Sequence, residues 1–226
     1  MQETLLQAAA LIIPLIVAIV FHEVAHGWVA RALGDPTAHR QRRLSLNPLR
    51  HVDPVGTIVV PGMLALASAP VFGWAKPVPV VKQRLNNPRY GMMAVAAAGP
   101  FTNFVLAAVG AIALGLLARS GSGGAVLGFL ALNLQNFILI NIFLALFNLL
   151  PIPPFDGSHI VEGLLPPRAA RTYEKLRPLG FPLLFLLLLV IPYLWPQFGI
   201  VQRFVVPPVL WAADHYDALV RSIAGV

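Results

Sequence analysis

The sequence predicts an all-α integral membrane protein, a polytopic helical bundle of about four to five spans. Three observations lead to this fold class: 58% of the 226 residues are hydrophobic, only 11% are charged, and the mean hydropathy is +0.76. Soluble domains are about 45–50% apolar and about 25% charged, so the composition excludes an ordinary soluble domain, a disordered chain and a coiled coil. The absence of cysteine excludes disulfides, thiolate zinc sites and cysteine nucleophiles.

Five stretches with few or no charges give the order of the elements. They are residues 5–30, 54–75, 91–118, 124–155 and 178–202. A helix needs about 20 residues to cross a hydrocarbon core about 30 Å thick, so the first, third, fourth and fifth stretches can each span it. Glycines and prolines interrupt the second stretch, which argues against a continuous helix there.

The distribution of lysine and arginine predicts that residues 54–75 enter and leave the membrane on the same side. If this stretch crosses, the 16 basic residues divide into 8 and 8; if it returns, they divide into 13 and 3. Only the second division shows the positive charge expected on the cytoplasmic side. We therefore expect a re-entrant or surface-lying segment, four spans and an external N-terminus. The net charge of +7 indicates contact with anionic lipids rather than nucleic acid.

The C-terminal part is expected to hold a span at residues 178–197 and then an interfacial helix at 198–222. Pro207 and Pro208 split the last segment, and Asp214 and Asp217 make its end polar. Such a mixed segment favours a helix lying on the membrane over another crossing.

The first apolar stretch contains the pattern His-Glu-x-x-His at His22, Glu23 and His26. On a helix, positions i and i+4 share a face, so both imidazoles can bind one zinc ion while Glu23 projects beside it. Zinc lowers the pKa of a bound water, and a neighbouring carboxylate can take the proton from that water. Ionisable residues inside a membrane helix are costly and indicate function. The alternative is a buried hydrogen-bonded cluster that packs two helices.

Asp156 is the candidate third ligand. It comes directly after the longest uncharged run, which ends in Pro151-Ile152-Pro153-Pro154-Phe155, and a lone carboxylate at such a helix break suits a metal. Alternatively, Asp156 caps a helix that begins at Gly157.

Taken together, these segments resemble the site-2 protease family of intramembrane zinc metalloproteases. Five motifs in family order carry the resemblance: residues 21–27 (Phe-His-Glu-Val-Ala-His-Gly), 46–56, 73–80, 98–103 (Ala-Gly-Pro-Phe-Thr-Asn) and 148–157. They cover roughly residues 15–165. The chain looks like a short form without a PDZ or other soluble domain, a single membrane-embedded domain over residues 1–226 with a catalytic core at about 5–165.

The resemblance implies one zinc ion held by His22, His26 and Asp156, with Glu23 as general base. It further implies that Asn148 and Asn103 bind substrate or stabilise the oxyanion, although helix–helix hydrogen bonding is an alternative for both amides. By its position three residues after Asp156, and not by the resemblance, His159 is a candidate for a supporting contact behind Asp156, or else a bystander. Residues 73–80 would form a membrane-dipping β element, giving a β-hairpin near residues 54–90, or else a rigid loop.

The implied function is a zinc metalloendopeptidase that hydrolyses peptide bonds in or near transmembrane segments of membrane proteins. We expect a multi-pass protein of a bacterial or archaeal plasma membrane, with its active site towards the cytoplasm and no nucleic-acid partner. The alternative is a non-enzymatic membrane protein that binds or transports metal; its ion path would need more polar residues along several helices than this sequence has. The sequence leaves the oligomeric state and the natural substrate open.

Overall fold

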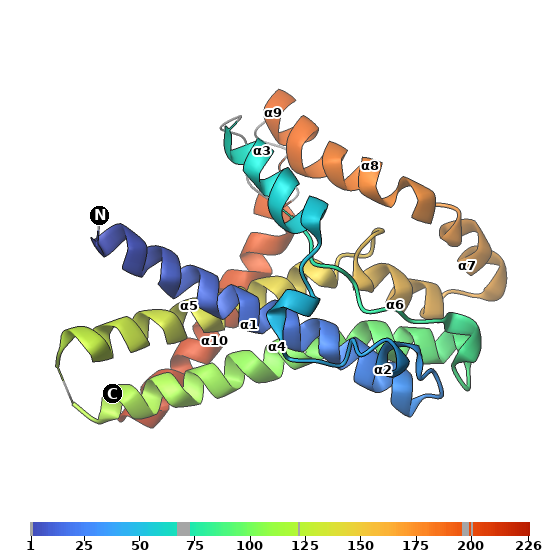
Figure 1. The fold of residues 1–226 in the computed structure, drawn as a ribbon. Coiled ribbons are helices and arrows are strands. Elements are labelled where there is room, and N and C mark those ends of the chain that lie inside the picture. The colour runs from blue at the N-terminus through green and yellow to red at the C-terminus, as the bar shows by residue number, and fades with distance from the viewer. Residues whose placement is uncertain (1, 67–72, 122, 196–198, 200) are drawn as a thin grey trace.

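The architecture is helical, as the composition predicts. A computed structural model describes residues 2–66, 73–121, 123–195, 199 and 201–226 (Figure 1). No β-strand forms within these ranges, so the predicted all-α fold class is confirmed.

Four helical segments of the described chain are long and apolar enough to cross a membrane. The first lies in α1 (Gln2–Ala32), the next two are α4 (Pro88–Arg119) and α5 (Ala125–Asn148), and the last covers Pro167–Leu194. At 1.5 Å per residue, even the 24 residues of α5 extend about 36 Å, more than the roughly 30 Å hydrocarbon core. This number agrees with the predicted four to five spans.

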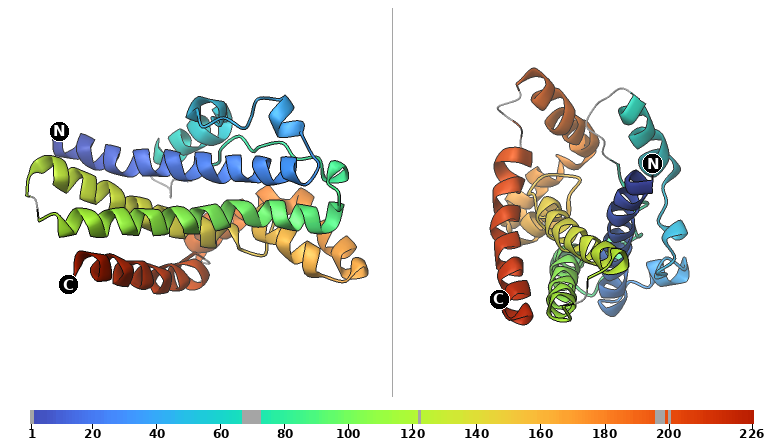
Figure 2. Two further views of the ribbon diagram at one scale, coloured as in Figure 1. Left: turned by 90° about the horizontal axis from the view of Figure 1, so that it is seen from below. Right: turned by 90° about the vertical axis from the view of Figure 1, so that its left-hand side faces the viewer.

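Helix α4 lies at the centre of the bundle and packs against α1, α5, α6 (Asp156–Leu164) and α10 (Val206–Ala224). The sequence determines where α4 begins, because Asn87 caps the helix: its side chain accepts hydrogen bonds from the backbone N–H groups of Arg89 and Tyr90. Alanine and glycine line its buried faces, which lets neighbouring helices approach closely. Figure 2 shows α1, α4 and α5 running alongside one another.

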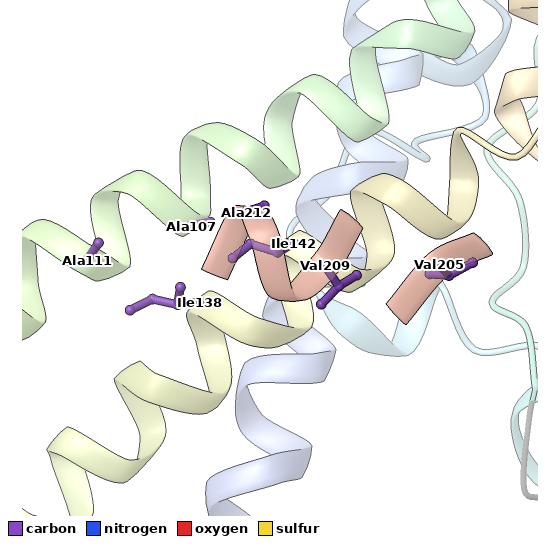
Figure 3. Packing of buried hydrophobic residues seen from close by; sticks show 7 residues of the cluster. All are labelled: Ala107, Ala111, Ile138, Ile142, Val205, Val209 and Ala212. Carbon is purple, nitrogen blue, oxygen red and sulfur yellow. The ribbon is translucent and has the colours of Figure 1, made fainter. Parts of the chain in front are cut away.

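A cluster of buried apolar side chains joins α4, α5 and the C-terminal helix (Figure 3). Its members are Ala107, Ala111, Ile138, Ile142, Val205, Val209 and Ala212. Helix α10 thus packs against both α4 and α5, and Tyr216 Oη donates to the Phe104 carbonyl at 2.9 Å. Whether it also lies in the membrane interface stays a prediction.

The second apolar stretch begins with a π-helical turn, Pro54–Val59, followed by α3 (Val60–Leu66). Together these 13 residues extend about 20 Å, too short to cross the hydrocarbon core. The chain also comes back to its starting point, because Trp74 N donates to the Gly56 carbonyl at 3.1 Å. Both facts favour the re-entrant path; residues 67–72 lie outside the described chain.

Residues 73–81 form neither helix nor strand, so the β-hairpin alternative is not seen in the described residues. The backbone groups of this segment bond to side chains and loops rather than to a paired strand. Val78 N donates to Glu23 Oε2 at 2.9 Å, Val81 N donates to Asp35 Oδ2 at 2.6 Å, and the Lys76 carbonyl accepts from Arg43 at 2.7 Å. The segment is therefore fixed along α1 and the loop that follows α1.

The remaining elements are short. They are α2 (Thr37–Arg40), 3-10 turns at Pro48–Arg50, Lys82–Arg84 and Arg177–Leu179, and π-helical turns at Leu186–Val190 and Val201–Val205. The last membrane-length segment is built from α7 (Pro167–Glu174), α8 (Gly180–Phe185) and α9 (Ile191–Leu194). It begins earlier than the predicted span at 178–197, because Pro167 starts a helical turn ahead of the apolar run, and residues 196–198 lie outside the described chain.

Candidate metal centre

Helix α1 places the two histidines of the His-Glu-x-x-His pattern on one face. The ring centroids of His22 and His26 lie 4.7 Å apart with an interplanar angle of 88°. Both side chains are buried, at 6% and 9% exposure. The i, i+4 spacing thus produces the convergence that the sequence predicts.

Asp156 completes a three-residue group with these histidines. Its Oδ2 atom lies 3.1 Å from His22 Nε2 and 3.3 Å from His26 Nε2. The three potential ligand atoms all lie within 4.8 Å of one another. Asp156 is the first residue of α6, and its side chain makes no capping hydrogen bond there, so the alternative of an N-cap aspartate is not seen.

The Nδ1 atom of each ring has its own hydrogen-bond acceptor. His22 Nδ1 lies 2.5 Å from Asn103 Oδ1, and His26 Nδ1 lies 2.7 Å from the Val95 carbonyl. A neutral imidazole that donates through Nδ1 presents the lone pair of Nε2 on its other side. The centre therefore brings together two imidazole lone pairs and a carboxylate with no donor between them. Such a set of acceptors fits a divalent cation, and nitrogen and carboxylate ligands suit zinc.

Asn141 is a part of this centre that sequence reasoning missed. Its Oδ1 accepts from Asn103 Nδ2 at 2.7 Å, and its own Nδ2 donates to the Phe137 carbonyl at 2.8 Å. Both asparagines are fully buried. The available signal was an amide on the uncharged α5, two helical turns before Asn148, where a polar side chain inside a membrane span needs a partner.

Asn103 uses both of its N–H groups within the bundle. They donate to Asn141 Oδ1 and to the Ala18 carbonyl, while Oδ1 faces His22. No donor is left for a substrate oxyanion, so this arrangement matches the helix–helix alternative and additionally orients His22.

Glycine at position 99 permits the close approach of α4 to the two rings. A Cβ atom at Gly99 would lie 2.5 Å from His22 Cε1 and 2.6 Å from both His22 Nε2 and His26 Cε1. Real Cβ atoms do not approach other atoms this closely, and any side chain at this position would displace both imidazoles.

Three other predicted residues have contacts of their own. Glu23 accepts from Val78 N through Oε2, whereas Asn148 donates to the Leu144 carbonyl one turn earlier, at 3.0 Å. The ring of His159 contacts Arg177, with Nδ1 3.0 Å from a guanidinium nitrogen. The roles of Asn148 in oxyanion binding and of His159 behind Asp156 stay predictions.

A cluster of ionic side chains surrounds His159, and its carboxylate, Glu162, lies outside the membrane-length segments. Glu162 accepts from Lys82 Nζ at 2.6 Å and from Arg177, and only 11% of its side chain is exposed. Burial acts to raise the pKa of Glu162, but the hydrogen bond from Lys82 and the charge of Arg177 outweigh it and hold the pKa below its ordinary value. This cluster joins α6 to the segments that carry Lys82 and Arg177.

Comparisons with known proteins agree with the metal centre. The family model described as "Peptidase family M50" matches residues 125–191 of this chain. The chain is 41% identical over 195 residues to "Putative zinc metalloprotease YwhC" of Bacillus subtilis, covering 83% of this chain and 84% of that protein. It is 29% identical to "Putative zinc metalloprotease Rip2" of Mycolicibacterium smegmatis, covering 76% of this chain and 63% of that protein.

A similar archaeal protein is "Putative zinc metalloprotease MJ0611" of Methanocaldococcus jannaschii, at 33% identity over 63% of this chain and 64% of that protein. No solved structure matches the chain. Between α4 and α5 only residues 120–124 intervene, so no domain is inserted there. By its identity to relatives over most of their length, the chain belongs to peptidase family M50, the site-2 protease family of zinc metalloproteases.

Proposed function

We propose that this protein is an intramembrane zinc endopeptidase that hydrolyses peptide bonds in or near transmembrane segments of membrane proteins. The observation that carries this proposal is the convergence of Asp156 with His22 and His26, two residues of a membrane-length helix. His26 lies six residues before the end of α1, which is about 9 Å along the helix axis. The reaction would thus take place within the bilayer and not above it.

His22, His26 and Asp156 would hold one zinc ion. When bound, zinc supplies Lewis acidity to a carbonyl and lowers the pKa of a water. The chain's own contribution begins with the Nδ1 contacts to Asn103 and Val95, which fix the ring orientations before the ion binds.

Glu23 would act as the general base and then as the general acid. One of its carboxylate oxygens, Oε2, accepts from Val78 N, which fixes the rotamer of the side chain. The other oxygen, Oε1, accepts no hydrogen bond from the described residues and can receive the proton of a water. The carboxyl group would then deliver that proton to the nitrogen of the leaving amine.

The substitution Glu23→Gln tests this function on purified protein in vesicles with single-pass reporter substrates. The zinc content should be unchanged, whereas cleavage should fall by a factor of about 10² to 10⁴ or more, since general acid–base catalysis supplies that much. Glu174→Gln is the matched control, because Glu174 is half exposed and pairs with Arg177. Undiminished cleavage by Glu23→Gln would exclude the mechanism, and equal zinc flux through both proteins would favour metal transport.

Asp156→Ala tests the third ligand separately. The expected result is a lower zinc content at equal expression, because two imidazoles alone leave the ion one ligand short. An unchanged stoichiometry would remove Asp156 from the ligand set.

The proposal also states on which side of the membrane the candidate metal centre lies. The excess of basic residues after the C-terminal end of α1 and before α4 supports a cytoplasmic position for this end of the bundle. The substrates would then be membrane proteins cut near the cytoplasmic face of a bacterial or archaeal plasma membrane. A cysteine introduced at Gln83 should react only from the cytoplasmic side; labelling from outside would contradict this topology.

A further inference from the structure

A basic hollow lies on the loop between α1 and the re-entrant segment, outside the candidate metal centre. It has a volume of about 300 Å³ and is lined by His39, Arg42, Leu44, Ser45 and Arg50. We propose that this hollow binds a phosphate group, supplied by the head group of an anionic phospholipid.

The first argument is the backbone at Arg42. Helix α2 ends in a Schellman-type turn, in which Arg43 N donates to the Ala38 carbonyl and Arg42 N to the His39 carbonyl. Arg42 has φ = 54°, the left-handed conformation that normally selects glycine at this position. A side chain other than glycine, asparagine or aspartate is disfavoured there. An arginine at a position suited to glycine indicates that its side chain has a role that offsets this strain.

The second argument is uncompensated charge. Arg42 and Arg50 both line the hollow, and no aspartate or glutamate of the described residues lies within ion-pair distance of either. Arg50 donates to the Arg42 carbonyl at 3.1 Å, which holds the two residues together. Two guanidinium groups presented to one hollow repel each other unless an anion lies between them. Phosphate oxygens match the fork of guanidinium N–H donors.

The hollow offers neutral donors as well. The hydroxyl oxygen of Ser45 accepts from Asn47 N at 3.2 Å, which leaves the hydroxyl proton free to donate. His39 lies 3.3 Å from Arg31 through Nδ1, so its Nε2 side is available to the hollow. A hydroxyl group and an imidazole beside two guanidinium groups form a donor set typical of phosphate sites.

Exposed leucines favour a lipid as the source of the phosphate. Leu46 is 56% exposed and Leu49 is 78% exposed, and both lie in the loop that forms the hollow. Large apolar side chains beside arginines are typical of segments that insert into the boundary between head groups and acyl chains. In a membrane protein, the head group of a lipid would reach this hollow while its acyl chains lie beside the leucines.

The test is native mass spectrometry of the full-length protein in detergent, titrated with phosphatidylglycerol or with phosphatidylcholine. We expect retention of one phosphatidylglycerol in preference to phosphatidylcholine. Arg42→Gly and Arg50→Gln should each weaken retention about 10-fold or more, since each removes a charge-assisted hydrogen bond. Inorganic phosphate, titrated in the presence of phosphatidylcholine alone, forms a second arm; saturable binding there that depends on Arg42 assigns the phosphate chemistry to a soluble ion.

Arg40→Gln is the matched control, because Arg40 is exposed on α2, carries the same charge and does not line the hollow. Equal losses in Arg40→Gln and Arg42→Gly would show a diffuse charge effect and overturn the proposal. So would equal retention of both lipids by the wild type together with no binding of phosphate. Arg42→Gly also separates binding from folding, because glycine relieves the strained backbone and should leave the midpoint of thermal unfolding unchanged or higher.

Discussion

Replacing Gly99 by alanine should abolish zinc binding while leaving the bundle folded. The added Cβ would lie 2.5 Å from His22 Cε1 and 2.6 Å from His26 Cε1. Carbon atoms in ordinary contact are about 3.5–4.0 Å apart, so each ring would have to retreat by about 1 Å. Neither ring can do so freely, because Asn103 and the Val95 carbonyl hold the two Nδ1 atoms.

A displacement of this size exceeds what a zinc site tolerates. Ligand distances must lie within about 0.2 Å of their preferred values, so a shift of about 1 Å breaks at least one of the two nitrogen contacts. Misplacement by about 1 Å typically costs about 10²-fold in catalysis, and we expect at least that loss in kcat/KM for a membrane-protein reporter. The overpacking itself should destabilise the fold by about 1–3 kcal/mol, which a membrane bundle of this size can absorb.

Zinc content after dialysis, reporter cleavage and thermal unfolding should be measured in parallel. Gly128→Ala is the control, because a Cβ at Gly128 meets no atom within 4 Å and the helix gains a better helix former. The control should keep full zinc content and activity. The reasoning is refuted if Gly99→Ala binds zinc with the affinity of the wild type, since the rings would then have moved without loss of the centre.

Three further predictions concern the contacts around the centre. Asn141→Ala should lower the zinc affinity about 10-fold, because it frees the Asn103 amide that orients His22. Asn136→Ala is the control: it removes a hydrogen bond from another part of α5 to the Ala10 carbonyl and should leave the zinc affinity unchanged. Competition with a chelator measures the zinc affinity of both variants. Burial acts to raise the pKa of Asp35, but hydrogen bonds from Thr37 and Val81 hold it below its ordinary 3.8, so this carboxylate stabilises the fold fully above about pH 4 and loses that effect as the pH falls through the lower folded value. Thermal unfolding on acidification should therefore show a larger loss for the wild type than for Asp35→Asn. Glu162→Gln should destabilise the protein by about 1–3 kcal/mol, because it leaves the partly buried Lys82 without its carboxylate and removes one of the two carboxylate partners of Arg177. Glu174→Gln should destabilise it by less than about 1 kcal/mol, and chemical unfolding compares the two.

The spans and the ligand candidates could be predicted because each depends on local information. The length of an apolar run decides whether a helix can cross a bilayer, and the i, i+4 spacing of His22 and His26 decides that they share a face. Asp156 was predictable for a related reason: a carboxylate at a proline-broken helix end, next to a long uncharged run, is costly unless a cation compensates its charge. The balance of positive charge predicted that residues 54–75 return to the side of the membrane from which they start, and the hydrogen bond from Trp74 N to the Gly56 carbonyl agrees with such a return.

Contacts between distant segments could not be predicted in the same way. Nothing in the sequence around Val78 indicates that its N–H group bonds to Glu23, because that contact depends on how an extended segment lies along α1. The roles of Gly99 and Asn141 depend on the register between α1, α4 and α5, which small residues leave open until the helices pack. No strand forms at residues 73–80 within the described chain, where the Glu23 carboxylate accepts the N–H group of Val78.

The polar groups inside the bundle form one connected series, and its end requires either a bound cation or protons on the imidazoles. From Phe137 the hydrogen bonds lead through Asn141 and Asn103 to His22, and each N–H group in the series has an acceptor. In hydrocarbon, an unsatisfied polar group costs several kcal/mol, so such a series is stable only if its last member is also satisfied. That last member is the set of acceptors formed by His22, His26 and Asp156, which no donor of the described chain satisfies. A bound divalent cation, or protons on the imidazoles, must complete it, and this requirement ties the packing of three spans to the occupancy of the metal centre.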